Sequence, residues 1–250
     1  MCLIVLAWRP GHDWPLLVAA NRDEFYARPS RPLAEWEDAP GLYAGRDLEA
    51  GGTWLGVTAG GRFAALTNIR DPRQAPGSRS RGELVAGFLR GQLSPAEYLE
   101  QVAAAARAYS GFNLLVGNRD ELHYLNAREG RPRPLAPGLY GLSNAALDTP
   151  WPKLQRSKAA FAECLDSPSA EALLELLADP EPASDADLPD TGVGLATERL
   201  LSSPFIASPT YGTRASTALL RRADGHQLLV ERSFGPLGAR LGEVRVEIRP

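Results

Sequence analysis

"MCLIVLAW" (residues 1–8) and "LLVAA" (16–20) are two apolar runs separated by the turn-rich connector "RPGHDWP". Two apolar runs joined by Pro, Gly and Asp are typical of an antiparallel hairpin. With a turn centred near His12, antiparallel register places Cys2 opposite the first three residues of "NRDE" (21–24). The sequence therefore predicts that the start of the chain and this polar motif meet in space.

Composition limits the classes of function. The chain has 250 residues, a hydrophobic fraction of 44% and a formal net charge of -3. Its arginines are scattered singly, so they form no basic field of the kind that nucleic-acid binding requires. No segment reaches the length of a membrane span, and the apolar start lacks the features of a secretory signal. We therefore expect a soluble cytoplasmic protein with no nucleic-acid partner and no transmembrane segment, and the sequence leaves its oligomeric state open.

Further elements follow in an order that disfavours alternating βαβ units. A second hairpin is predicted at 51–69, with its turn at Gly60 and Gly61. Helices are predicted at 80–91, 94–109, 151–167 and 168–180, and strands at 111–118, 121–129, 138–144, 214–222, 226–234 and 243–249. This order favours antiparallel sheets covered by helices in one α+β domain spanning 1–250. The acidic, proline-bearing stretch at 180–194 is predicted to be a mobile loop.

Cys2 offers a specific chemistry if Met1 is removed. Methionine is normally trimmed before a small residue, and the freed α-amino group titrates at about pH 8, so it could accept the proton of the thiol. The simpler interpretation is a buried thiol that begins a strand, because cysteine is among the most buried residue types. Judged on this residue alone, the simpler interpretation is favoured.

Further polar residues end or interrupt apolar strands: Arg22, Asp23, Asn68, Asn144 and Arg214. Arg22 could stabilise a thiolate and Asp23 could orient the terminal ammonium group, although an ordinary salt-bridge cluster would give the same pattern. An asparagine amide can donate to a developing oxyanion, and an arginine can orient a carboxylate. Each residue is a weak signal alone, because asparagine commonly ends strands by bonding its own backbone.

Other familiar sites have no support in the sequence. The three histidines show neither Ser-His-Asp nor HExxH spacing, and Cys2 and Cys164 belong to no CxxC pattern. The glycine pairs form neither GxGxxG nor a P-loop. We therefore expect no metal site and no dinucleotide cofactor.

The chain resembles the NRDE family, the homologues of transport and Golgi organisation protein 2. The resemblance runs from residue 2 to about residue 233 and rests on Cys2, "AANRDEFYARPS", "GGTWLG", "ALTN", "RGELV", "GFNLL", "YGLSNA" with "TPW", "YGTR" and "ERS", in that order. That family is grouped by similarity with the N-terminal nucleophile (Ntn) hydrolases. The resemblance implies a four-layer αββα sandwich with two mostly antiparallel sheets.

The cysteine branch of those hydrolases, which contains bile salt hydrolase and penicillin V acylase, cleaves amide bonds. By this resemblance, Cys2 is the nucleophile, Arg22 and Asp23 activate it, Asn68 and Asn144 donate to the oxyanion or substrate, and Arg214 is the late arginine. The chain departs from the hydrolases because Arg22 and Asp23 are adjacent. Adjacent strand residues point to opposite faces, so only one of them reaches Cys2 unless the strand ends or bulges there.

Members of the NRDE family are also associated with haem trafficking and with lipid or acyl-CoA homeostasis. A haem carrier could use Cys2 or a histidine as an axial ligand, with arginines meeting the propionates, although CxxCH and Cys-Pro are both absent. The resemblance thus implies a haem or acyl-lipid binding protein or, alternatively, an N-terminal cysteine amidohydrolase that needs no cofactor. A third interpretation is that the polar cluster is structural. In the first two, a small-molecule ligand occupies a pocket at Cys2.

Overall fold

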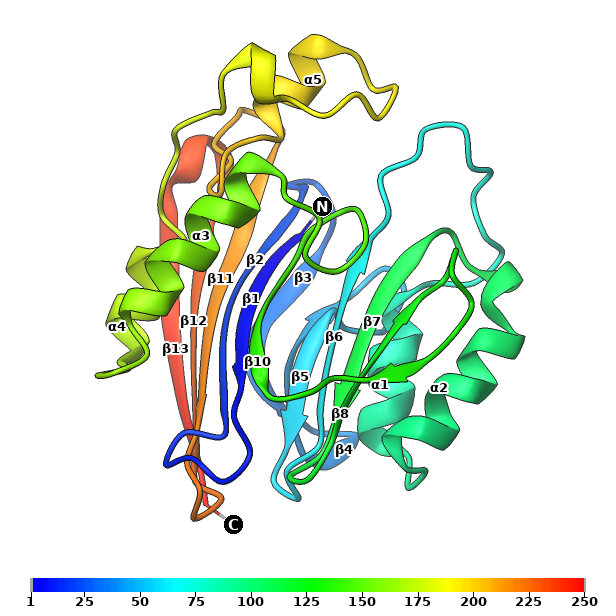
Figure 1. Ribbon diagram of the computed structural model, residues 1–250, viewed down its shortest axis with the longest axis vertical. Coiled ribbons are helices and arrows are strands. Elements are labelled where there is room, and N and C mark those ends of the chain that lie inside the picture. The colour runs from blue at the N-terminus through cyan, green and yellow to red at the C-terminus, as the bar shows by residue number, and fades with distance from the viewer. Residues whose placement is uncertain (1, 250) are drawn as a thin grey trace.

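The computed structural model describes residues 2–249, and Figure 1 shows two sheets that face each other with helices on both outer sides. Sheet A has six strands in the order β10-β1-β2-β11-β12-β13. They are β1 (Cys2–Trp8), β2 (Leu16–Phe25), β10 (Gly138–Leu142), β11 (Tyr211–Arg221), β12 (Gln227–Phe234) and β13 (Arg240–Ile248). All neighbouring strands of sheet A are antiparallel.

Sheet B has seven antiparallel strands in the order β3-β4-β5-β6-β7-β8-β9. They are β3 (Ser30–Trp36), β4 (Ala39–Asp47), β5 (Leu55–Thr58), β6 (Phe63–Asn68), β7 (Phe112–Gly117), β8 (Leu122–Asn126) and β9 (Arg133–Pro134). The predicted hairpin at 51–69 is confirmed as β5 and β6. The hairpin of β3 and β4 is an addition that the sequence patterns do not predict.

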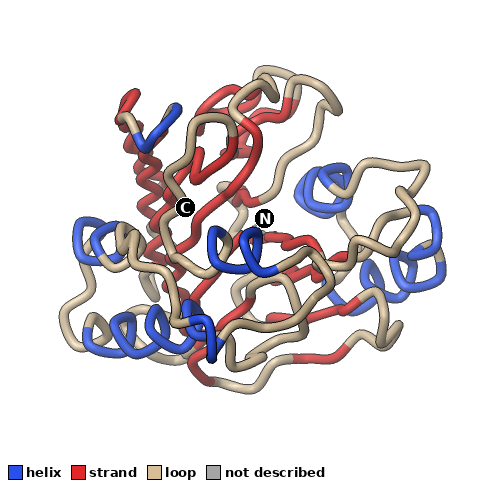
Figure 2. The backbone as a smooth tube through the Cα atoms, turned by 90° about the horizontal axis from the view of Figure 1, so that it is seen from above, coloured by secondary structure: helices blue, strands red, loops and turns tan. Residues whose placement is uncertain are grey.

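Helices cover the outer face of each sheet. They are α1 (Gly82–Arg90) and α2 (Pro95–Ala104) on sheet B, α3 (Pro152–Glu163) and α4 (Ala170–Glu175) on sheet A, and α5 (Leu195–Leu200) at the end of the molecule near the start of the chain. In the view from above, the helices lie on opposite sides of the strands (Figure 2). The predicted αββα sandwich of two antiparallel sheets is therefore confirmed.

The first hairpin has the predicted register. Cys2 lies directly opposite Arg22, and Leu3 lies opposite Asn21. Ile4 packs in the core between the sheets, whereas Val5 packs in the core beneath α3 and α4. Because both faces of β1 are covered, both must be apolar, which explains why "CLIVLAW" is a continuous apolar run and not an alternating one.

Several helices end earlier than predicted. Ser94 and Glu97 form the expected capping box at the start of α2, but this helix stops at Ala104 and a 3₁₀ turn, η1 (Ala106–Ala108), follows. Of the helix predicted at 168–180, only the part that forms α4 is a regular α-helix. Beyond Glu175 the backbone hydrogen bonds form isolated turns and no longer continue the helix. Alanine-rich and leucine-rich sequence favours helix locally, but packing against the sheet decides where each helix ends.

The acidic stretch at 180–194 contains a second 3₁₀ turn, η2 (Asp185–Asp187), and is tied to α5. The amide of Ala183 donates to Ser202 Oγ at 2.9 Å, and the amide of Thr191 donates to Glu198 Oε1 at 2.8 Å. Its mobility stays a prediction. Within residues 2–249, no helix is both long and apolar enough to cross a membrane.

Candidate active site

Cys2 lies at a cavity between the two sheets. The cavity has a volume of about 700 Å³ and is bordered by residues of both sheets and of the loop that precedes α1. Cys2 is 5% exposed and shares the inner face of β1 with Ile4 and Leu6, so its thiol points toward the space between the sheets. The predicted removal of Met1 concerns a residue outside the described range.

Arg22 is on the same face of sheet A as Cys2. It is the register partner of Cys2, borders the cavity, and its Nη2 lies 3.9 Å from Glu24 Oε2. Burial raises the pKa of the Cys2 thiol, and the carboxylates of Asp23 and Glu24 raise it further, whereas Arg22 lowers it. The net shift is upward, so the thiol needs a proton acceptor before it can act as a nucleophile.

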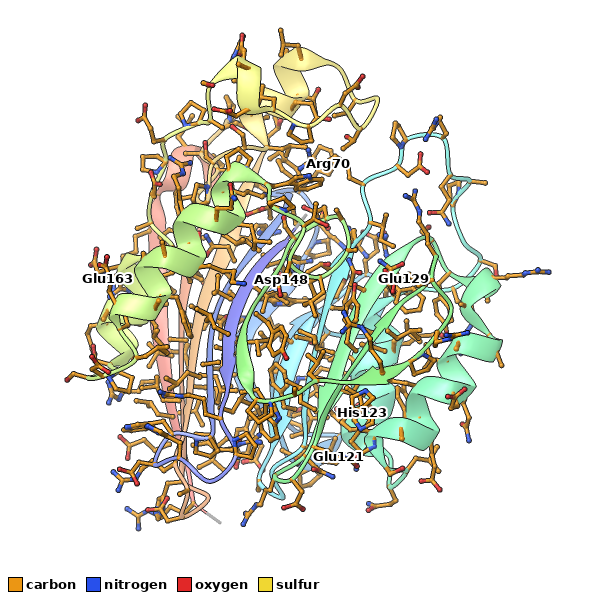
Figure 3. The ribbon with its side chains drawn as sticks, viewed as in Figure 1. Arg70, Glu121, His123, Glu129, Asp148 and Glu163 are labelled. Carbon is orange, nitrogen blue, oxygen red and sulfur yellow. The ribbon has the colours of Figure 1, made fainter. Side chains whose placement is uncertain are left out.

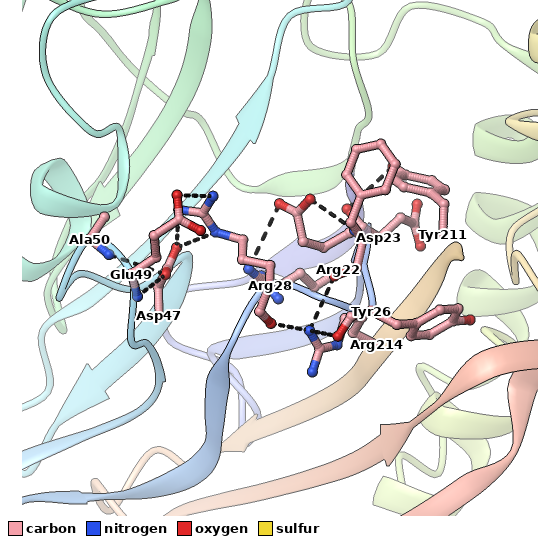
Figure 4. Close-up of polar contacts among 11 residues, drawn as sticks. Arg22, Asp23, Tyr26, Arg28, Asp47, Glu49, Ala50, Tyr211 and Arg214 are labelled. Carbon is pink, nitrogen blue, oxygen red and sulfur yellow. Dashed lines mark hydrogen bonds and ion pairs between the residues drawn. The ribbon is translucent and has the colours of Figure 1, made fainter. Parts of the chain in front are cut away.

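Asp23 also borders the cavity, but as the neighbour of Arg22 it projects its side chain from the opposite face of β2, on the side of α3. It is 1% exposed, and the hydroxyl of Thr213 donates to its Oδ1 at 2.8 Å. The hydroxyl of Tyr211 donates to the Asp23 carbonyl oxygen at 3.3 Å (Figure 4). Burial raises the pKa of the Asp23 carboxyl group, while the charge of Lys153 and the Thr213 hydrogen bond lower it. Adjacency thus separates Arg22 and Asp23 onto two faces, as expected for successive strand residues.

Arg214 sits in a β-bulge. The pairing of β11 with β2 shifts register between Thr213 and Ala215, which leaves Arg214 without a partner across the strands. Its guanidinium donates to the carbonyl oxygens of Phe25 and Tyr26, both at 3.2 Å, and to that of Arg28 (Figure 4). Arg214 therefore fixes the turn that follows "NRDE" at the rim of the cavity.

Asn68 and Asn144 are brought together, but only Asn68 borders the cavity. The side-chain amide of Asn144 donates to the Asn68 carbonyl oxygen at 2.8 Å, and the carbonyl oxygen of Asn144 accepts from the amide of Arg70 at 2.8 Å. The neighbouring Ser143 donates its hydroxyl to the Cys2 carbonyl oxygen at 3.1 Å. Asn144 therefore holds the end of β6 in place, whereas Asn68 is the asparagine in contact with the cavity.

The arginines around the cavity fall into two groups. Arg22, Arg28, Arg46 and Arg79 form ion pairs with the carboxylates of Glu24, Asp47, Asp38 and Glu83, respectively. Within residues 2–249, three others form no ion pair with a carboxylate: Arg31, Arg81 and Arg214. Burial lowers the pKa of the Arg81 guanidinium, and a thiolate at Cys2 would oppose that shift. These three arginines can bind an anionic group of a ligand, in a cavity that carboxyl groups such as those of Glu24 and Glu231 also border.

Three charged residues near this site are not singled out by the sequence patterns: Arg81, Lys153 and Glu231. Each stands in or beside a motif of the resemblance, since Arg81 opens "RGELV", Glu231 opens "ERS", and Lys153 is the second residue after "TPW". Lys153 and Glu231 are 1% and 4% exposed. Charged side chains are rarely buried, so sequence alone offers no reason to place them inside the protein.

Two facing antiparallel sheets between helical layers, with a cysteine at the head of an inner strand, define an Ntn-hydrolase-like fold. The C2A mutant of conjugated bile acid hydrolase from Clostridium perfringens has a similar fold, with a TM-score of 0.54 and 8% sequence identity. The alignment covers 98% of this chain and 92% of that enzyme. At this level of identity, the likeness concerns the fold alone.

Sequence comparison identifies the family. The family model described as transport and Golgi organisation 2 matches residues 1–236. The transport and Golgi organization protein 2 homologs of Homo sapiens and Bos taurus are 38% and 40% identical to this chain, over 94% of this chain and 93% of each relative. The Drosophila melanogaster protein of the same name is 27% identical, over 90% of this chain and 88% of its own length. The chain belongs to the transport and Golgi organisation 2 family.

Proposed function

We propose that the cavity at Cys2 is the active site of an N-terminal cysteine amidohydrolase acting on a small, partly apolar amide that carries an anionic group. The observation that carries this proposal is the placement of Cys2 at the cavity, directly opposite Arg22 and with Asn68 in the wall. A nucleophile, a cation beside it and an amide donor thus border one space.

The reaction follows from the chemistry of an N-terminal cysteine. With Met1 removed, the α-amino group accepts the thiol proton and the Cys2 sulfur attacks the amide carbon. The tetrahedral oxyanion accepts hydrogen bonds from Asn68, whose backbone Asn144 holds in place. The proton passes to the leaving nitrogen as the carbon–nitrogen bond breaks and leaves a thioester. Water then cleaves the thioester, which releases a carboxylic acid and restores the thiol.

The substrate class follows from the charge of the cavity. Arg31, Arg81 and Arg214 border it without carboxylate partners among the described residues, so a carboxylate or phosphate on the ligand would meet donors already in place. Trp54 and Leu66 supply apolar surface in the same wall. A ligand with an apolar acyl part and an anionic part would match both the apolar surface and the arginine donors of the cavity wall.

Binding and transfer of haem or an acyl-lipid is the second candidate, favoured by the size of the cavity and by the same arginines. For haem, the propionates would meet the arginines, but the iron finds no histidine among the described residues that border the cavity. Cys2 remains as an axial ligand, and the raised pKa of its thiol opposes thiolate ligation. Among these ligands, an anionic acyl-lipid fits this wall better than haem.

Intact mass is the first test, because a retained Met1 leaves no free amine on Cys2 and would refute the hydrolase. Wild type, Cys2→Ala and the control Cys164→Ala should then be screened against N-acyl amino acids and acyl-CoA thioesters. Cys164 is the other cysteine, on the far side of sheet A at the end of α3. We expect turnover of an N-acyl amino acid that Cys2→Ala abolishes and Cys164→Ala retains.

Binding measurements on the same three proteins separate the two candidates. Haem and a fatty acyl-CoA are titrated by absorbance and by calorimetry. Stoichiometric uptake of either ligand without turnover, equal in wild type and Cys2→Ala, would support the carrier and contradict the hydrolase. Turnover that is unchanged in Cys2→Ala would contradict the assignment of the nucleophile.

A further inference from the structure

Lys153 is an unusual cation in this chain. The sequence has only two lysines, Lys153 and Lys158, and both lie on α3. Lys158 is partly exposed and its Nζ pairs with Asp148 Oδ1 at 2.7 Å. Lys153 is 1% exposed, and its Nζ has no hydrogen-bond partner among residues 2–249. A buried ammonium group without hydrogen bonds is costly, so this position calls for a physical reason.

The charged groups that act on Lys153 come from four different segments. Burial lowers its pKa to about 8. The charge of Asp23 on β2 opposes this shift most strongly, Cys2 and Glu198 oppose it less, and Arg70 adds to it. Arg70 and Glu198 form a buried ion pair with each other, so their charges largely cancel at Lys153. Asp23 is therefore the principal counter-charge of Lys153.

The surrounding groups show where this cluster lies. Arg70 stacks over the ring of Trp151, 4.7 Å from its centroid, and lies near the first turn of α3 (Figure 3). From β11, Tyr211 also faces Asp23, and burial raises the pKa of its phenol so that it stays neutral. On the cavity side, Arg22 and Glu24 act on the Cys2 thiol. Among the charges of the described side chains, that of Lys153 lowers the pKa of the Asp23 carboxyl group most strongly.

The backbone of Cys2 lies between the cavity and this cluster. Its thiol points to the inner face of sheet A, while Asp23 and Lys153 lie on the side of α3. Removal of Met1 places a second amine, the α-amino group of Cys2, in the plane of the sheet between the two sides. Two ammonium groups near one buried carboxylate repel each other, which lowers the pKa of both amines and favours the neutral form of one of them.

We infer that Lys153 is a positioning residue that competes with the α-amino group of Cys2 for Asp23 and thereby keeps that amino group neutral. This inference rests on the proposed function, because only a free α-amine on Cys2 needs to be kept basic. A neutral amine is the form that accepts the thiol proton. Lys153 therefore acts on the thiol through the amine and does not touch the substrate.

The test uses protein released from a cleavable N-terminal fusion, so that Cys2 is the first residue. The titration of the Cys2 α-amino group is followed from pH 5 to pH 10 by ¹⁵N NMR of ¹⁵N-cysteine-labelled protein, for wild type, Lys153→Met and the control Lys158→Met. Methionine keeps most of the length of the lysine side chain and removes its charge. We expect the midpoint of the amine titration to rise by about one pH unit in Lys153→Met and to stay unchanged in Lys158→Met.

A second measurement does not depend on the folding of Lys153→Met. Wild type labelled with ¹³C-lysine gives signals from two lysines, and Lys158→Arg assigns them. We expect Lys153 to titrate below the ordinary range of a lysine, and its midpoint to move again when Met1 is retained, because the α-amine is then displaced. Titration of Lys153 in the ordinary range of a lysine would overturn the inference, as would an unshifted amine midpoint in folded Lys153→Met.

Neither readout requires a substrate, so the two proposals can fail separately. Shifted midpoints in a protein that hydrolyses no amide would leave the role of Lys153 standing and refute the hydrolase. Cys2-dependent turnover with an unshifted midpoint would refute the role of Lys153 and leave the hydrolase standing.

Discussion

The buried carboxyl group of Glu231, on β12, should make the free energy of unfolding depend on pH. Substitution of this one residue should abolish that dependence. Its side chain borders the Cys2 cavity, is 4% exposed, and accepts the amide hydrogen of Leu33 at 2.7 Å. Burial raises the pKa of this carboxyl group from 4.5 to about 7, and the Leu33 hydrogen bond and the charge of Arg22 only partly oppose the shift.

The sign and size of the effect follow from proton linkage. Between pH 4.5 and pH 7 the folded protein holds a proton on Glu231 that the unfolded chain has lost, so stability falls as pH rises through this window. The rise of this pKa from 4.5 to about 7 corresponds to about 3 kcal/mol of unfolding free energy, present below pH 4.5 and lost above pH 7. Glutamine can still accept from the Leu33 amide but cannot ionise.

Urea denaturation of wild type and Glu231→Gln at pH 4, 5, 6, 7 and 8 tests this reasoning. We expect the stability of Glu231→Gln relative to wild type to increase by about 3 kcal/mol from pH 4 to pH 8. Glu247→Gln is the matched control, because Glu247 lies on the neighbouring strand β13 with a side chain that is 68% exposed. A constant difference between Glu231→Gln and wild type across this range would refute the raised pKa.

Three further predictions concern single hydrogen bonds. Asn144→Ala removes the donor to the Asn68 carbonyl oxygen and should lower the unfolding free energy by about 1 to 3 kcal/mol in urea denaturation. Ser94→Ala removes the cap of α2 and should cost about 1 kcal/mol in the same assay, without affecting ligand binding. Thr213→Val removes the hydroxyl that donates to Asp23, so it should raise the pKa of that carboxyl group further, as followed by infrared titration of its carboxyl band.

The start of the chain shows how far sequence can predict this fold. Hairpin register depends only on the positions of the apolar runs and of the turn, so the sequence alone suffices to place Cys2 opposite "NRDE". The hairpin of β3 and β4, residues 30–47, cannot be recognised in this way. Much of β3 and β4 is exposed and carries charged residues, which weakens the alternation that marks a strand.

The candidate site is predictable only in part, for a similar reason. Cys2, Arg22 and Asn68 end or begin apolar strands, and strand ends at one edge of a sandwich meet at one cavity. Lys153 and Arg81 lie at the starts of helices, where lysine and arginine are ordinarily solvated. Their burial depends on contacts across the whole fold, between segments far apart in sequence.

Because Arg22 and Asp23 are adjacent in sequence, their side chains project from opposite faces of β2. Were the two residues separated by one position, both would project from the same face of β2 and compete for the same space. As neighbours, Arg22 reaches the cavity beside the thiol, and Asp23 reaches the buried cluster beneath α3 with Lys153. In the proposed mechanism, the thiol meets a ligand on one side of sheet A, and Lys153 and Asp23 set the charge of the terminal amine from the other side. The departure from the hydrolase pattern therefore does not preclude catalysis by Cys2, because acid–base control can act through the plane of the sheet.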